Sequence, residues 1–299
     1  ERLYHFANQS IDMMVTPCHQ MVVRRRRRSR RGEFRTTAER LWRMSECVVP
    51  RTGTWNGGDD PEQLFGLDAG DVAEFIGWFL SEGSRVTTRA GTKSTIAISQ
   101  SRTAHLENCA RLERLFARLG FTWNYVASGP SYYVGVRSVP EGLLWLLDEQ
   151  GCAVEKFVPS MFFQVSRRIA ARLLEGLLFG DGSLSESERL GRQPAWVFGS
   201  ASALLADGVQ ILALLMGKRA SVRKSKRGLY VVRMAVKRFA SVDDAKRQIV
   251  DYRDVAFCVT VRNHAIYVRR NGIAAFTGNS QYRELLLTVP GREPDAARI

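Results

Sequence analysis

Two stretches of the sequence decide its fold: FIGWFLSEG at Phe75–Gly83 and LLEGLLFGDG at Leu173–Gly182. Each is apolar on nearly every side, which predicts a helix that is buried on several faces. Small residues at positions i and i+4 form a flat strip on a helix, so two such helices can pack with their backbones close together. The small pairs are Gly77 with Ser81 and Gly176 with Gly180.

Both stretches end in an acid, Glu82 in the first and Asp181 in the second. Each acid precedes a glycine that suits a left-handed helix C-cap. A carboxylate at a helix C-terminus opposes the helix dipole, and two such carboxylates brought together repel each other unless a cation lies between them. Because oxygen ligands favour a hard divalent ion, we expect Mg²⁺ at this point.

The pattern around each stretch recurs along the chain. After the first stretch, the sequence predicts two strands, a helix and two more strands, in the ranges 85–100, 106–119, 121–126 and 132–136. After the second, it predicts a strand beginning at 195, a helix at 204–216 and paired strands at 220–223 and 229–236. Two copies of an α-β-β-α-β-β unit are therefore expected.

The two stretches resemble the motif of the LAGLIDADG (dodecapeptide) homing endonucleases at the small residues and at the acid-glycine ending. The resemblance implies paired motif helices between two pseudo-symmetric halves, and saddle-shaped sheets that grip double-stranded DNA. It also implies that Glu82 and Asp181 hold divalent metal ions that activate water for phosphodiester cleavage. The first motif departs from the family, since Glu82 replaces the usual Asp and Trp78 and Phe79 are bulkier than is typical.

A basic helper is expected beside the acids, to stabilise charge that develops on the phosphate. The stretch Glu155–Pro159 resembles the lysine-containing block ahead of the second motif in intein endonucleases. This resemblance makes Lys156 the third candidate catalytic residue. The alternative is an ordinary surface lysine that precedes a proline.

Basic residues concentrate in the last hairpin of the second copy, with nine between Lys218 and Arg238 and no acid among them. Alternation in this hairpin puts Arg233 and Lys237 on one face of a sheet and apolar residues on the other, as a phosphate-contacting surface requires. The candidate DNA contacts are Lys93, Arg223, Lys224, Lys226, Arg233 and Lys237.

Both ends of the chain resemble the splicing blocks of inteins. A Thr and a His lie three positions apart in IDMMVTPCHQMVV, at Thr16 and His19, and the other block lies in residues 255–280. In inteins this Thr and His polarise the N-terminal scissile amide. The resemblance also assigns Cys258 and His264 to positions that assist the junction chemistry.

The stretch GNS then supplies the C-terminal junction. The side-chain amide of Asn279 can attack its own backbone carbonyl, and Ser280 supplies the nucleophilic hydroxyl. Gly278 stands where inteins usually have a His. The chain begins at Glu1 without the usual Cys or Ser nucleophile, so we expect an N-terminally truncated element that cannot complete splicing in cis.

Composition limits the alternatives. The 299 residues carry a net charge of +14, which favours a polyanionic partner, although half of that excess comes from the run between Arg24 and Arg31. No apolar run reaches the ~18 residues that a membrane span needs. Five widely spaced cysteines argue against a disulfide framework or a zinc site, so we expect a cytoplasmic protein. Both motifs lie in one chain, so we expect a monomer.

The expected fold class is α+β, with two LAGLIDADG repeats inserted in a mostly-β, Hint-type splicing domain. Its parts are the splicing domain at 1–50 and 251–279, a linker at 51–65, the endonuclease at 66–250, and host (extein) sequence at 280–299. The favoured function is an intein-encoded, DOD-type endonuclease that excises at Asn279/Ser280, with the extein as its partner in cis. Two alternatives stay open: a cleavage-inactive, DNA-binding protein of regulatory or maturase-like type, and a free-standing endonuclease.

Overall fold

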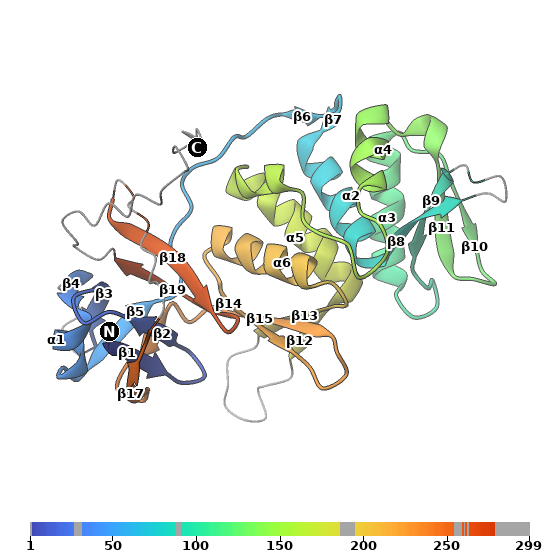
Figure 1. The fold of residues 1–299 in the computed structure, drawn as a ribbon. Helices are drawn as coiled ribbons and strands as arrows, with labels where there is room; N and C mark the ends of the chain where they lie inside the picture. The colour runs from blue at the N-terminus through green and yellow to red at the C-terminus, as the bar shows by residue number, and fades with distance from the viewer. Residues whose placement is uncertain are drawn as a thin grey trace, which may run out of the picture.

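The computed structural model describes residues 2–26, 32–87, 91, 93–185, 195–253, 259, 261 and 263–278. They form an α+β fold whose buried apolar side chains make two separate cores (Figure 1). The larger core is built from the two repeats and the smaller one from strands near both ends of the chain. Among the described helices, none is both long enough and apolar enough to cross a membrane.

The first repeat contains six elements in the predicted order. They are α2 (Ala69–Glu82), β8 (Gly83–Thr87), β9 (Lys93–Ser99), α3 (Leu106–Leu119), β10 (Trp123–Val126) and β11 (Ser131–Gly135). The strands form one sheet in the order β10-β11-β9-β8. Helix α3 ends at Gly120, which takes the left-handed conformation with φ 70°. A short helix, α4 (Glu141–Asp148), and the turn η2 (Ser160–Phe163) lead to the second repeat.

The second repeat has the same order. Its elements are α5 (Arg167–Asp181), β12 (Gly182–Ser185), β13 (Ala195–Ser200), α6 (Ala203–Leu215), β14 (Arg219–Lys224) and β15 (Tyr230–Ala235). The strands lie in the order β12-β13-β15-β14, so each strand has the neighbours of its counterpart in the first repeat. Both repeats therefore have the predicted α-β-β-α-β-β arrangement.

Helices α2 and α5 pack against each other through their small residues. A Cβ atom built on Gly77 would lie 2.3 Å from the carbonyl oxygen of Leu173, and one built on Gly176 would lie 2.3 Å from that of Glu74. Nothing larger than glycine fits at either position, because the atoms that it would meet belong to the backbone of the other helix. The predicted close approach of the two motif helices is confirmed.

The predicted left-handed caps at the ends of these two helices are wrong. Gly83 has φ −97° and ψ 157°, and Gly182 has φ −93° and ψ 149°, so both are extended. Each glycine is already the first residue of a strand. A Cβ atom there would lie 2.6 Å from the Cα atom of Phe79 or 2.3 Å from the carbonyl oxygen of Leu178. Glycine is needed because the first residue of each strand lies directly against the backbone of the last helical turn.

The smaller core lies between two sheets, β17-β1-β2 and β16-β5-β3-β4. From the start of the chain come β1 (Arg2–Ala7), β2 (Asp12–Val15), β3 (Gln20–Arg25), β4 (Phe34–Thr37), α1 (Ala38–Trp42) and β5 (Cys47–Pro50). From the end come β16 (Phe239–Ser241) and β17 (Lys246–Asp251). The chain thus passes into the smaller core near Phe239, inside the range 66–250 that the sequence assigned to the repeats.

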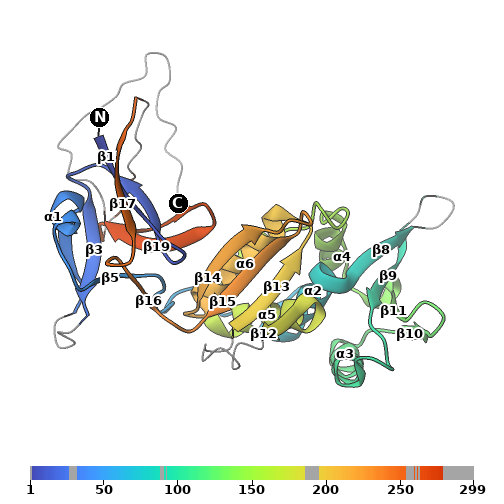
Figure 2. The ribbon, with the colours of Figure 1, turned by 90° about the horizontal axis from the view of Figure 1, so that it is seen from below.

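A hairpin joins the two cores. It consists of β18 (Ala265–Arg270) and β19 (Ile273–Gly278), and β19 extends the second-repeat sheet beyond β14 (Figures 1 and 2). The buried Arg51 donates to the carbonyl oxygens of Ala274 at 3.1 Å and Ala220 at 3.3 Å, so one side chain holds both strands. The strands of the smaller core are therefore tied directly to the repeats.

Candidate active site at the paired helix ends

The pairing of α2 with α5 brings the two acids together. The packed glycines are 99 residues apart along the chain, and so are Glu82 and Asp181, so the helices run parallel and end side by side. A Cβ atom on Gly180, next to Asp181, would lie 3.0 Å from Cγ of Glu82. Two carboxylates and the negative ends of two helix dipoles thus meet at one place.

The electrostatics of this place disfavour two bare negative charges. Burial raises the pKa of Glu82, and the charge of Asp181 raises it further, while Lys156 opposes both. Desolvation by the surrounding protein atoms also raises the pKa of Asp181, although the residue as a whole is exposed, and Lys156 again opposes the shift. The form in which both acids are ionised is therefore unfavourable, and a bound cation would stabilise it.

Lys156 caps the end of α2. Its Nζ donates to the carbonyl oxygens of Phe79 at 2.9 Å and Gly83 at 2.7 Å, and the side chain is buried. Burial lowers the pKa of Lys156 to about 8, while the charges of Asp181 and Glu82 act to raise it. The alternative of an ordinary surface lysine is therefore wrong, because this ammonium lies inside the protein within electrostatic reach of both acids.

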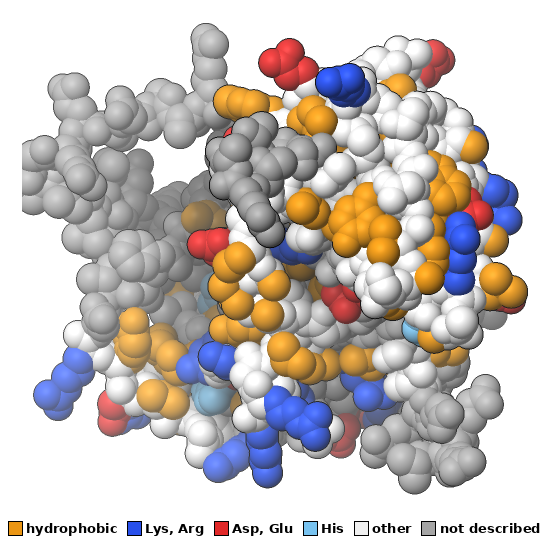
Figure 3. All heavy atoms as spheres, turned by 90° about the vertical axis from the view of Figure 1, so that its right-hand side faces the viewer, with side chains coloured by type: hydrophobic (Ala, Val, Ile, Leu, Met, Phe, Trp, Pro, Cys, Tyr) orange, Lys and Arg blue, Asp and Glu red, His pale blue; other side chains and the backbone are white. Residues whose placement is uncertain are grey.

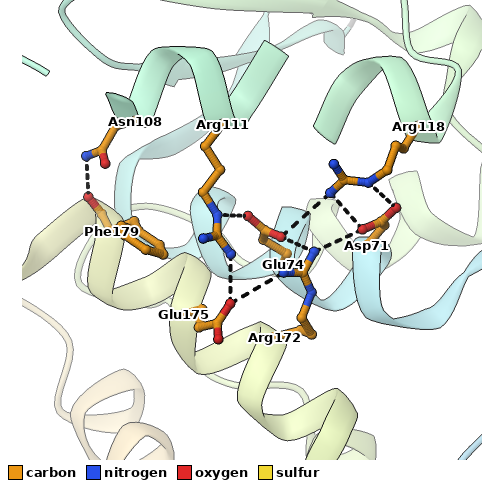
Figure 4. A network of polar contacts seen from close by, with 8 residues as sticks. All are labelled: Asp71, Glu74, Asn108, Arg111, Arg118, Arg172, Glu175 and Phe179. Carbon is orange, nitrogen blue, oxygen red and sulfur yellow. Dashed lines mark hydrogen bonds and ion pairs between the residues drawn. The ribbon is translucent and has the colours of Figure 1, made fainter. Parts of the chain in front are cut away.

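The end of α5 is held by helix α3 of the other repeat. Asn108 donates from Nδ2 to the carbonyl oxygen of Phe179 at 2.9 Å, and the guanidinium of Arg111 lies 4.2 Å from the centre of the Phe179 ring (Figure 4). The same ring stacks on Trp78 of α2, with 6.1 Å between ring centres. Phe179 precedes Asp181 by two residues, so these contacts position the turn that carries the acid.

Asn108 and Arg111 were not predicted from the sequence. Arg111 belongs to a polar network whose members are Asp71, Glu74, Arg111, Arg118, Arg172 and Glu175, whereas Asn108 binds the Phe179 carbonyl (Figure 4). Arg118 binds Asp71 through two hydrogen bonds of 2.7 and 2.9 Å, and Glu74 is fully buried. The sequence did show polar residues at helical spacing along α3, which could have indicated these contacts. A polar helix face usually contacts solvent, so this pattern did not distinguish them.

The predicted basic surface lies on the second repeat. Among the candidates, Arg223, Lys224, Lys226, Arg233 and Lys237 are all exposed. Strand β15 ends at Ala235, so Lys237 lies beyond the sheet, and Val236, one of the apolar residues that the alternation placed on the opposite face, is 66% exposed. Lys93 begins β9, but its side chain is outside the described residues. Arg219 was missed, although its alternation with Arg223 along β14 indicated the same face.

The TxxH element lies against the end of β19. The ring Nε2 of His19 is 2.8 Å from the hydroxyl of Thr277, and both residues are buried. A Cβ atom on Gly278 would lie 2.5 Å from the carbonyl oxygen of Gln20, so the last described residue of β19 packs tightly on β3. These contacts join residues about 258 positions apart and place the exit of β19 beside His19.

The other predicted splicing residues are less fully described. The Thr16 hydroxyl is buried, 3.6 Å from the sulfur of Cys18. His264 lies in the turn before β18 with φ 53°. Cys258, Asn279 and Ser280 lie outside the described residues. The cysteines that are described, Cys18, Cys47, Cys109 and Cys152, are all free thiols.

The burial of His19 predicts a pH-dependent stability. Burial lowers the pKa of His19 to about 4, from 6.5 in an unfolded chain, because the folded protein disfavours the charged ring. The unfolded chain therefore takes up a proton first as the pH falls. Stability from this residue is complete above about pH 6.5 and is lost between 6.5 and 4, by up to about 3 kcal/mol. Urea unfolding at both ends of this range measures the loss.

A matched comparison isolates His19 from the other titrating groups. In His19→Gln, the free energy of unfolding should fall less between neutral and acidic pH than in the wild-type protein. Equal losses in the two proteins would show that His19 titrates normally.

Comparison with known proteins assigns part of this fold. Residues 168–250 match the sequence model of the LAGLIDADG-like domain, a range that runs from helix α5 to strand β17. No curated protein matches this chain in sequence.

Solved structures with a similar arrangement include the homing endonuclease I-DmoI. A mesophilic variant of it aligns with a TM-score of 0.40 at 13% identity, over 56% of this chain and 89% of the other. I-DmoI in complex with DNA and Mn aligns with a TM-score of 0.39 at 12% identity, over 56% and 90%. Full-length DUF199/WhiA from Thermatoga maritima aligns with a TM-score of 0.40 at 11% identity, over 56% and 51%.

Proposed function

We propose that this chain is a LAGLIDADG-type, DOD-type homing endonuclease that cuts double-stranded DNA at a long recognition site with the help of a divalent metal ion. The observation that carries the proposal is the meeting of Glu82 and Asp181 at the ends of two parallel buried helices. Acids in this position destabilise each other, so they have no evident structural use there. The match to a LAGLIDADG-like domain supports the same reading.

The two acids fit Mg²⁺ as a shared ion. Within the described part of the chain, no three His, Cys, Asp or Glu side chains converge in a way that could hold a metal. Mg²⁺ is ordinarily held by one or two carboxylates, with water and substrate phosphates completing its shell, so Glu82 and Asp181 suffice. A bound divalent ion supplies charge that stabilises the attacked phosphate and lowers the pKa of a water molecule.

The chain's own residues prepare this place. Lys156 offsets the negative charge of the helix ends and keeps the carbonyl oxygens of Phe79 and Gly83 bonded. This favours the ionised form of both acids, since the Lys156 charge lowers the pKa of each. Lys156 would therefore support phosphate cleavage indirectly, through its charge near the two acids. It would keep its bonds to the two carbonyl oxygens and would not contact the DNA.

The sheets would supply the DNA contacts. In the view from below, strands β13, β14 and β15 lie in front of helices α5 and α6, so none of the described helices covers this face of the sheet (Figure 2). By strand register, Arg223 and Arg233 lie on this face, whereas the exposed Lys224 pairs with Tyr230 on the helix side. Lys226 lies in the turn after β14, Lys237 lies beyond β15, and Lys93 begins β9 of the first repeat. Cations on an open sheet suit contact with the phosphates of a duplex.

Selection from a pool of DNA tests the cleavage proposal. Duplexes with a randomised central segment are incubated with the protein and Mg²⁺, and in parallel with EDTA, and the cut ends are sequenced. We expect cut ends that share one long sequence, only with the metal. Retention of a common sequence without cutting would instead identify a DNA-binding protein that has lost cleavage.

We propose further that the smaller core is a Hint-type splicing domain whose endonuclease is the inserted part. The supporting observation is the contact of His19 with Thr277, which brings the TxxH element to within two residues of Asn279. At this junction the side-chain amide nitrogen of Asn279 would bond to the backbone carbonyl carbon of the same residue. The peptide bond to Ser280 would break, and the departing amine would take the proton.

Mass spectrometry of the purified chain tests the splicing proposal. We expect slow release of residues 280–299, with a succinimide left at Asn279, and no release from Asn279→Ala. Thr16→Ala retains Asn279, so it should release the fragment like the wild type if Thr16 acts only at the N-terminal junction. An intact wild-type chain after prolonged incubation would contradict the proposal and leave the endonuclease proposal standing.

A further inference from the structure

The outer faces of the two repeat sheets, which point away from the helices, differ in charge. In the second repeat, Ser221 pairs with Arg233, Arg219 with Ala235 and Arg223 with Val231. Paired residues lie on the same face of a sheet, and the residues between them face the other way. The buried Val232 and Met234 mark the helix side. Arg219, Arg223 and Arg233 therefore share the outer face.

No acid neutralises these three arginines within the described part of the chain. Arg223 and Arg233 are exposed, and none of the three forms an ion pair or a side-chain hydrogen bond with a described residue. Burial, and then the charge of Arg233, lower the pKa of Arg219, so these cations repel each other. A face that holds like charges close together without counterions favours a polyanion.

The outer face of the first-repeat sheet is neutral where its side chains are described. The buried Ile96, Ile98, Tyr132 and Val134 mark its helix side. The register of β8, β9, β10 and β11 then defines the opposite side. The hydrogen-bonding side chains on that side are Ser84, Thr95, Ser99, Asn124, Ser131 and Tyr133.

The one described arginine side chain in these strands points the other way. Arg85 pairs with Ile96 on the helix side, and its Nε lies 2.7 Å from the Asp148 carboxylate. The end of the molecule that the first repeat forms shows hydrophobic and uncharged side chains with basic and acidic ones scattered among them (Figure 3). Lys93 lies two residues before Thr95 in β9, but its side chain is outside the described residues. Among the described side chains, the outer face of the first repeat thus offers neutral donors and acceptors, whereas that of the second offers cations without a described counterion.

We infer that the two repeats divide the work of DNA recognition: the second anchors the duplex through its phosphates, and the first reads sequence through neutral hydrogen-bonding side chains. This rests on the proposed function as a DNA-binding nuclease. Phosphate contacts position a duplex without reading it, whereas uncharged side chains discriminate between base edges without releasing counterions. The affinity for DNA and its salt dependence would then come from the second repeat, and the selectivity for a DNA sequence from the first.

The salt dependence of binding separates these roles. The probe is a fluorescent duplex selected from the randomised pool, and its affinity is measured over a range of salt concentrations. Arg223→Gln and Arg233→Gln should each reduce the slope of log affinity against log salt by about 0.9. Asn124→Ala and Tyr133→Phe should leave this slope unchanged but broaden the sequences that a second selection recovers.

A control variant and two contrary outcomes make the result decisive. Arg114→Gln removes an exposed charge from helix α3 and not from a strand, and should change neither the slope nor the selectivity. The division of roles between the repeats would be wrong if variants of both repeats changed the slope equally, or if only the arginine variants lost selectivity. Either result would leave the proposed function standing. A wild-type protein that binds no duplex would overturn the proposed function as well.

Discussion

Replacement of Asp181 by Asn is expected to abolish DNA cleavage, by at least about a hundredfold, and to leave DNA affinity close to that of the wild type. Asn has the shape of Asp but not its charge, so the helix end keeps its packing while the metal loses a carboxylate ligand. Asp181 raises the pKa of Glu82, so this pKa should fall in Asp181→Asn. Single-turnover cleavage, equilibrium binding and NMR titration of Glu82 measure the three effects.

The matched control is Glu107→Gln, which removes an exposed carboxylate from the first turn of α3, near Phe179. It should change neither cleavage nor binding. Loss of DNA binding in Asp181→Asn would point to a structural role for the acid. Unchanged cleavage would show that Asp181 does not hold the metal.

Gly176→Val is expected to destabilise the larger core by about 3 kcal/mol or more, a large part of the stability of an ordinary domain. A Cβ atom at this position would lie 2.3 Å from the Glu74 carbonyl oxygen and 2.9 Å from the Trp78 nitrogen. Both atoms belong to the backbone of α2, so they cannot move aside as a flexible side chain could. Urea unfolding and the yield of folded protein measure the effect.

The same substitution at Gly199 serves as the control. Gly199 lies in β13, and a Cβ atom there would have nothing within 4 Å. Valine suits a strand, so Gly199→Val should be neutral or slightly stabilising. If both variants lost similar stability, the helix contact would not be the reason.

Local patterns account for the parts that were predicted well. The helix 106–119 was predicted to its exact bounds, because its apolar spacing and Gly120 both depend on residues within a few turns. The glycine pairs indicated a helix contact for a similar reason, since small size at positions i and i+4 is visible in the sequence. Repetition of the pattern then predicted two copies with the same topology.

Contacts between distant segments account for the parts that were missed. Lys156 was predicted as a site residue, but not its bond to the carbonyl of Phe79, which is 77 residues away, and Asn108, which is 71 residues from Phe179, was not predicted at all. Neither residue differs in type from an ordinary surface side chain. The extended conformation of Gly83 also has a tertiary cause, because the sheet draws the chain directly from the helix into β8.

The sequence by itself determined the α+β class, the repeated α-β-β-α-β-β unit and the two acids at the helix ends, since these depend on periodicity, residue size and spacing along the chain. Only the tertiary structure decided which groups surround the acids, that His19 contacts Thr277, and that Arg219, Arg223 and Arg233 share the outer face of one sheet. Those features arise from packing between segments far apart in the sequence, and packing depends on the shapes of both partners at once.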